Sequence, residues 1–340
     1  RRKPAADACP EGQRQAAQNE RRGDSHDAQA VDLDALTARL ASAHAAPAGD
    51  PFARRTHGAQ AAMRAGQAER TIGGAISSVL TQAYPGRVDI VVVDDGSTDA
   101  SAAVARSHGD RVSVVVQENA GTAAARNVAL SRAEGDLVAL CDADDILLPP
   151  YLRSAVDTWH RAGSGRRFVT CNALLMTENG IGHGRTVMNL PVPPPRRQRL
   201  GILEANFVSG FAVMPAAMLR ELGGWTVGCY VEDWELWVRA IYAGWEVIPA
   251  TAPHALYRWS AASKSTSMAD VYAAEDALLR GVLEGRMDVR PEERDYLQRR
   301  LGARSPRLLV HEAEQALRSG DVARARRRFV QAAALAPSNR

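Results

Sequence analysis

Short apolar runs that alternate with helical segments constrain the fold of this chain more than any other feature. Each run is five or six residues long and nearly continuous in apolar residues, which is typical of parallel strands buried on both faces. Strands and helices that alternate at this spacing predict right-handed βαβ crossovers and a doubly wound α/β sheet. Strands are expected at residues 88–93 (VDIVVV), 112–116 (VSVVV) and 136–141 (DLVALC), and helices at 71–80, 100–108, 121–132 and 231–243.

Composition and charge argue against nucleic acid as a partner and against a segment that spans the membrane. The chain has 340 residues, 46% of them hydrophobic, and a net charge of only +3, so nucleic acid is not expected as a partner. No apolar run approaches the length of about twenty residues that spans a bilayer. We therefore expect a cytoplasmic protein; a lipid-linked acceptor would bring it to the inner face of the membrane.

The chain divides into three parts by composition. Residues 1–69 are rich in Ala, Arg and Gln and poor in β-branched residues, so we expect them to be mostly disordered, apart from a weak helix at 31–40. Residues 70–265 hold the α/β pattern. Residues 266–340 are expected to be helical, and 308–335 resemble one tetratricopeptide-like hairpin, which suits a protein partner. Two segments are expected to be loops: 180–184 (GIGHG) and the proline-rich, basic 190–199.

Acidic residues follow two of the expected strands. Residues 91–99 read VVVDDGSTD and residues 140–145 read LCDADD, so aspartates emerge where an α/β sheet takes its ligand. Carboxylates repel a diphosphate, and a divalent cation resolves that conflict. Asp142, Asp144 and Asp145 offer the oxygen ligands that Mg²⁺ or Mn²⁺ prefers, and Asp95 is suited to accept hydrogen bonds from a nucleoside. The alternative for each cluster is turn formation or helix capping.

A third acidic pair, Glu232 and Asp233, opens the helix expected at 231–243. Its simplest interpretation is compensation of the helix dipole, which contributes about 0.3 to 1 kcal/mol. Tryptophans gather in this half of the chain, and they suit either the core or a wall on which a sugar stacks.

Five motifs together resemble glycosyltransferase family 2, which has the GT-A fold. In order they are VVVDDGSTD, NAGTAAARN at 119–127, LCDADDILLP, GGW at 223–225 and EDWEL at 232–236, and the resemblance covers about residues 69–265. It implies a mixed α/β sheet and a Mn²⁺- or Mg²⁺-dependent transfer from a nucleotide-diphosphate sugar, most commonly a UDP-sugar. It also implies inversion at the anomeric carbon and a glycan, lipid-linked or small-molecule acceptor.

The resemblance also implies a role for each matching residue. Asp233 would be the catalytic base that takes the proton from the acceptor hydroxyl. Trp225 and Glu232 would lie on the sugar or acceptor side. The QxxRW pattern of processive synthases is absent, which favours addition of a single sugar. The donor would be held by Asp95, Arg126, Asp142 and Asp144, with Asp142 and Asp144 also holding the metal.

The amino-terminal segment departs from the family pattern. Residues 57–70 contain no β-branched residue, so the sequence predicts that the family's first central strand is missing. We interpret this segment as the product of a shifted reading frame or a misplaced start. A degenerate, non-catalytic scaffold is therefore the alternative function. The related nucleotidyltransferases are disfavoured, since no Gly-rich loop with Arg and Lys follows a first strand.

Overall fold

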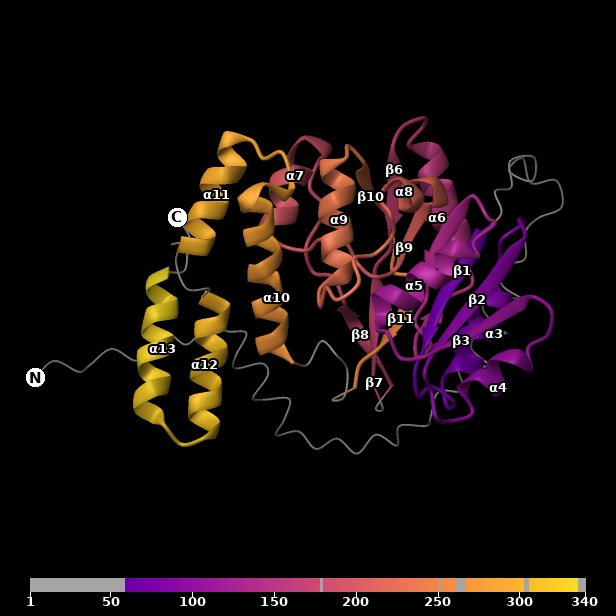
Figure 1. Cartoon of the computed structure of the whole chain (residues 1–340), viewed down its shortest axis with the longest axis horizontal. Helices are drawn as coiled ribbons and strands as arrows, with labels where there is room; N and C mark the ends of the chain where they lie inside the picture. Colours follow the sequence, from indigo (N-terminus) through magenta and orange to yellow (C-terminus); the bar gives the residue numbers. More distant parts are fainter. Residues whose placement is uncertain (1–58, 178–179, 251, 261–266, 303–305, 336–340) are drawn as a thin grey trace, which may run out of the picture. The chain divides into compact units, whose positions relative to one another are not determined.

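A mixed seven-stranded sheet organises the protein in the computed structural model, which describes residues 59–177, 180–250, 252–260, 267–302 and 306–335 (Figure 1). The strand order is β10-β6-β9-β4-β1-β2-β3, and β9 runs antiparallel to both of its neighbours. The predicted α/β class is confirmed. The strands are β1 (Ala59–Ala65), β2 (Val88–Asp95), β3 (Val112–Gln117), β4 (Leu137–Leu140), β6 (Arg167–Thr170), β9 (Ala212–Pro215) and β10 (Glu246–Pro249).

The central strand β1 corrects the prediction that the first strand is missing. β1 lies between β2 and β4 and pairs in parallel with both, with Met63 opposite Val92 and Arg64 opposite Val93. Its alanine-rich sequence has low intrinsic strand propensity, but the neighbouring strands supply the β-branched residues and hydrogen-bond partners on both sides. Met63 and Ala65 are fully buried in the core. Tertiary context therefore outweighs local propensity here, and the strand begins inside the part expected to be disordered.

Helices cover both faces of the sheet, and each face has its own hydrophobic core. One core packs α3, α4 and α6 against the even-numbered residues of β2, including Ile90 and Val92. The other packs α5, α7, α8 and α9 against Val91 and Val93. The helices are α3 (Ile72–Leu80), α4 (Ser101–Arg106), α5 (Thr122–Ser131), α6 (Tyr151–Arg161), α7 (Pro195–Glu204), α8 (Ala216–Glu221) and α9 (Glu232–Tyr242).

A second, four-stranded sheet has the order β5-β11-β7-β8. It corrects one predicted loop, because the GIGHG residues form the start of β8, paired with β7. The proline-rich loop was also predicted too long: α7 begins at Pro195, where proline is tolerated because the first helical N–H groups have no intrahelical acceptor. The strands are β5 (Ile146–Leu147), β7 (Ala173–Thr177), β8 (Gly180–Thr186) and β11 (Ala255–Arg258).

Four helices and a short π-helical turn follow the second sheet. Leu278 and Leu279 of α10 and Leu297 of α11 belong to the same core as α9, so these two helices are integral to the α/β domain. The predicted hairpin is present as α12 and α13, although its likeness to a tetratricopeptide unit stays a prediction. The elements are α10 (Met268–Gly281), η3 (Val282–Arg286), α11 (Pro291–Gly302), α12 (Pro306–Arg318) and α13 (Val322–Leu335).

The helix expected at 31–40 and most of the disorder expected for residues 1–69 fall outside the described residues. The weak helix at 31–40 lies outside them, as does the rest of the chain before residue 59. Among the residues that the structure describes, no helix is both long and apolar enough to cross a bilayer.

Candidate active site

A pocket of about 530 Å³ opens at the carboxyl ends of β1 and β4. Its walls come from the loop after β1, the turn after β4, the start of α9 and one side of α10. The pocket collects most of the predicted site residues. Arg126, Asp142, Asp144, Glu232 and Asp233 all line it.

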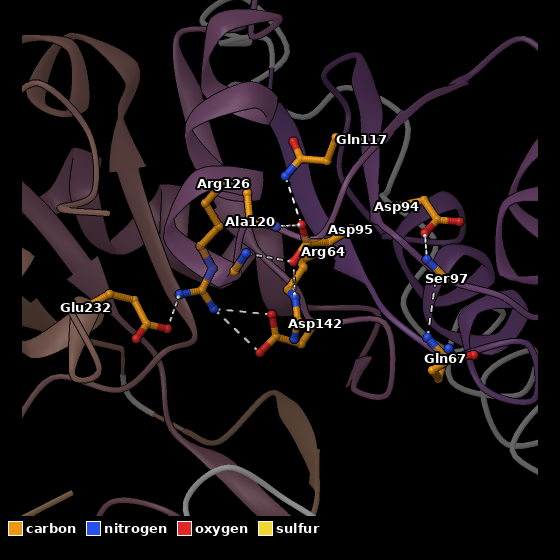
Figure 2. Close-up of polar contacts among 11 residues, drawn as sticks. Arg64, Gln67, Asp94, Asp95, Ser97, Gln117, Ala120, Arg126, Asp142 and Glu232 are labelled. Carbon is orange, nitrogen blue, oxygen red and sulfur yellow. Dashed lines mark hydrogen bonds and ion pairs between the residues drawn. The ribbon is translucent and has the colours of Figure 1, made fainter. Parts of the chain in front are cut away.

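Arg126 of α5 holds the acidic motifs together. Its guanidinium donates to Asp233 Oδ1 at 2.5 Å and to Asp142 Oδ1 at 3.2 Å, and it lies 3.7 Å from Glu232 Oε1. Figure 2 shows Arg126 between Glu232 and Asp142. Arg126 is only 4% exposed, so three carboxylates share one buried cation. One side chain therefore joins the motif after β4 to the motif that opens α9.

The protonation of this cluster follows from burial and from its mixed charges. Burial alone would lower the pKa of Arg126, but the carboxylates of Asp233, Asp142 and Glu232 raise it far above its ordinary value. Burial raises the pKa of Asp233; Arg126 opposes this rise, and the charges of Glu232 and Asp142 add to it. Arg126 thus stays charged, and Asp233 is a better proton acceptor than an ordinary aspartate.

The second carboxylate oxygen of Asp233, Oδ2, lies beside Gly210 at the pocket wall. Oδ1 is occupied by Arg126, whereas a Cβ atom built on Gly210 would lie 3.6 Å from Oδ2. Both Gly210 and Asp233 line the pocket, and the Asp233 side chain is 27% exposed. The Asp233 carboxylate is therefore partly accessible from the pocket.

The turn at residues 142–145 is fixed by both sheets, because β4 precedes it and β5 follows it. The backbone N–H of Asp145 donates to Asp142 O at 3.1 Å, which closes the turn. Arg258 of β11 donates from its backbone N–H to Asp145 Oδ1 at 2.9 Å and from Nε to Asp144 O at 2.9 Å. Asp145 therefore has a structural role, whereas the Asp142 side chain is 43% exposed and Asp144 is exposed.

The carboxylates of this turn repel one another. Burial raises the pKa of Asp145 well above its usual range, and the charges of Asp142 and Asp144 raise it further. Enclosure within the pocket also raises the pKa of Asp144, as does the charge of Asp142. Neighbouring carboxylates on a pocket wall are suited to a divalent cation, which would relieve the repulsion.

Asp145→Asn should stabilise the metal-free protein at neutral pH. A carboxyl whose pKa is raised in the folded state binds more protons there than in the unfolded state, so its ionisation costs stability as pH rises toward that raised pKa. We expect the amide to raise the free energy of unfolding by about 1 kcal/mol or more at pH 7. The gain should disappear as pH falls below the raised pKa. Urea unfolding in a chelator at several pH values measures it, and a less stable variant at pH 7 would contradict the prediction.

Asp95, predicted to contact the nucleoside, is buried and hydrogen-bonded within the protein. Its carboxylate accepts hydrogen bonds from Gln117 Nε2 and from the backbone N–H groups of Ala120 and Gly121, at 2.8, 2.8 and 3.1 Å (Figure 2). It is 1% exposed and does not line the pocket. Asp95 therefore shapes the loop that leads into α5. Asp94, on the opposite face of β2, accepts from the backbone N–H of Ser97 at 2.8 Å, as expected for a turn residue.

Trp225, predicted on the sugar side, lies in the core at 2% exposure and does not line the pocket. Asn127, which follows Arg126 in α5, hydrogen-bonds to both the N–H and the carbonyl group of the Trp225 backbone. Asn127 Oδ1 accepts from the N–H of Trp225, and Nδ2 donates to the Trp225 carbonyl, each at 2.8 Å. Gly224 has φ +74°, and a Cβ there would lie 2.2 Å from Asn127 Oδ1, so only glycine fits. Two consecutive residues of α5 thus position the carboxylates and the GGW segment.

Asn127→Ala should destabilise the protein without removing a charged group. It leaves the N–H and carbonyl of Trp225 without their partner, and each polar group left unsatisfied in a partly buried place costs about 1 to 3 kcal/mol. We expect the free energy of unfolding to fall by about 2 to 6 kcal/mol in urea titrations, since two groups lose their partner. Asn119→Ala is the matched control, since Asn119 is exposed and alanine keeps its Cβ. Equal stability of the two variants would contradict this account.

Arg64 and Gly210 line the pocket and were not singled out from the sequence. Arg64 was missed because its strand was not recognised; once β1 is assigned, the two-residue period of a strand places Arg64 on the face opposite Met63 and Ala65, which is the face of Asp95 and α5. Gly210 carries no signal in a single sequence. Within the described residues, no three His, Cys, Asp or Glu side chains are arranged to hold a metal by themselves.

Residues 64–223 match the family model described as "Glycosyl transferase family 2". Succinoglycan biosynthesis protein ExoU of Rhizobium meliloti (strain 1021) is 32% identical over 241 residues, which cover 62% of this chain and 66% of that protein. EpsE of Bacillus subtilis (strain 168) is 29% identical over 186 residues, covering 52% of this chain and 64% of that protein. The chain thus spans slightly less than two thirds of each relative. Over the matched residues the chain is therefore similar to glycosyltransferase family 2.

Solved structures match the fold over most of the chain. TarS 1-349 of S. aureus in complex with UDP-GlcNAc has a TM-score of 0.57 and 17% identity, covering 80% of this chain and 90% of that one. The mannosyltransferase PcManGT of Pyrobaculum calidifontis in complex with GDP-Man and Mn²⁺ has a TM-score of 0.55 and 18% identity, covering 89% and 98%. At this identity the likeness establishes the fold, which is the GT-A α/β fold.

Proposed function

We propose that this protein is an inverting glycosyltransferase that moves one sugar from a nucleotide-diphosphate sugar to an acceptor hydroxyl. The observation that carries the proposal is the contact of Arg126 with both Asp142 and Asp233 in one pocket. A helix-dipole role for Asp233 does not require a buried arginine from α5. The match to ExoU supports a place in polysaccharide biosynthesis, and the TarS complex supports a UDP-sugar as donor.

The residues around the turn after β4 fit a divalent cation. Asp142 and Asp144 present two carboxylates to the pocket, and the charges of both raise the pKa of Asp145. Mg²⁺ and Mn²⁺ commonly take one or two protein carboxylates and complete their coordination with phosphate oxygens and water. When bound, the cation would neutralise charge on the departing diphosphate. The complex of PcManGT with Mn²⁺ supports this assignment.

Asp233 would act as the base. Its Oδ2 takes the proton of the acceptor hydroxyl while that oxygen attacks the anomeric carbon from the face opposite the diphosphate. Arg126 fixes the carboxylate through Oδ1, and Glu232 lies against the same guanidinium on the acceptor side. A direct attack of this kind inverts the configuration of the sugar.

Nucleotide binding tests the proposal, and calorimetry measures it directly. UDP, GDP and dTDP are titrated into the full chain with Mn²⁺ and with a chelator. The corresponding sugar nucleotides are then assayed with glycan and lipid-linked acceptors for release of the nucleoside diphosphate. Metal-dependent binding followed by transfer with inverted anomeric configuration is the expected result. A folded chain that binds none of the three nucleotides would favour the scaffold alternative.

A further inference from the structure

The pocket is lined mostly by acidic side chains, which repel a diphosphate unless cations offset their charge. Six lining side chains are carboxylic acids and two are arginines. A nucleoside diphosphate brings further negative charge, so every cation in the wall matters for its affinity. The acids are Asp142, Asp144, Asp145, Glu232, Asp233 and Glu275, and the arginines are Arg64 and Arg126.

The two arginines differ in how far their charge is already neutralised. Arg126 is 4% exposed and contacts three carboxylates. The Arg64 side chain is 35% exposed, and its ion pair with Asp95 is long, with 3.6 Å between Nε and Oδ2. Asp95 already accepts three hydrogen bonds from other groups. Arg64 Nε itself is buried and makes no hydrogen bond within the described residues.

Gly66 leaves room for the Arg64 guanidinium at the pocket wall. A Cβ built on Gly66 would lie 3.3 Å from Nη2 of Arg64 and 3.7 Å from Cζ. Both residues line the pocket, and the charge of Arg64 also acts on Asp144. Figure 2 shows Arg64 beside Asp95, whose carboxylate is directed to the loop before α5. The guanidinium thus has one weakly engaged edge next to the residues proposed for the metal.

We propose that Arg64 binds the phosphate groups of the donor nucleotide. This inference rests on the proposed function. A guanidinium presents paired N–H donors that match phosphate oxygens, and Arg64 is the lining cation whose charge is least engaged among the described residues. Its long ion pair with Asp95 orients the side chain without exhausting its donors.

The test compares nucleotides that differ only in phosphate content. UDP, UMP and uridine are titrated into wild type, Arg64→Gln and Arg64→Lys, in Mn²⁺ and in chelator. Arg64→Gln should weaken UDP binding about 10- to 100-fold in both conditions, as expected for loss of hydrogen bonds to a charged group, and change uridine binding by less than about twofold. Lysine should restore part of the affinity. Arg70→Gln, an exposed arginine outside the pocket, is the control and should match wild type.

Gly66→Ala is a second variant that keeps the charge and displaces the guanidinium. We expect it to weaken UDP binding several-fold in wild type but to have no further effect in Arg64→Gln, because the two changes act through one contact. Unchanged UDP affinity in Arg64→Gln, or an equal loss for uridine and UDP, would overturn the assignment while leaving the proposed function intact. Wild-type protein that binds no nucleotide would overturn both.

Discussion

Asp233→Asn is expected to lower kcat by about 10²- to 10⁴-fold and to leave the Kd for UDP within about threefold. The amide keeps the size of the side chain and an oxygen that can accept from Arg126, but it cannot take a proton. The pocket, the turn after β4 and Arg64 are untouched. Single-turnover assays with the active donor measure the first quantity, and calorimetry measures the second.

Asp157→Asn serves as the control for this substitution. Asp157 pairs with Arg153 along α6 at 3.8 Å, where both side chains are half-buried, and it lies outside the pocket. The pH profile separates a base from a positioning residue. Because the pKa of Asp233 is raised, kcat/KM of the wild type should fall on the acid side at a higher pH than an ordinary aspartate gives. A kcat of Asp233→Asn near that of wild type would refute the role of base.

Asp144→Ala should abolish the effect of metal on donor binding. In Mn²⁺ we expect the Kd for UDP to rise by at least about 100-fold, since even residues that only orient metal ligands contribute 10- to 100-fold to affinity. In chelator the variant should bind UDP at least as well as wild type, because one repelling carboxylate has been removed. Exposed Asp110→Asn is the control. A variant that keeps full Mn²⁺-dependent binding would exclude Asp144 as a ligand.

Most of the α/β framework could be predicted from the sequence because its strands and helices carry strong periodic signals. The apolar run in β2 and the pattern of α9 are local, and both elements form where they were expected. β1 could not be predicted in this way. Its residues have low strand propensity, and the strand exists because two strongly apolar neighbours offer hydrogen bonds on both edges.

The structure brings most of the predicted site residues into one pocket, and their individual roles stay predictions. Asp142, Asp144 and Asp233 meet in one pocket because strand ends and the start of α9 converge there. The hydrogen-bond saturation of Asp95 and the burial of Trp225 depend on loops that are distant in sequence, and no spacing rule reports them. Such contacts become visible only when the side chains are placed.

The sharing of Arg126 between Asp142 and Asp233 makes the pocket a single electrostatic unit. A cation that neutralises Asp142 removes one of the charges that raise the pKa of Asp233 and leaves Arg126 more strongly engaged with the base. Donor capture and proton affinity are then linked functions of the same site. Metal binding at Asp142 would lower the pKa of Asp233 and favour the ionised form that a base requires.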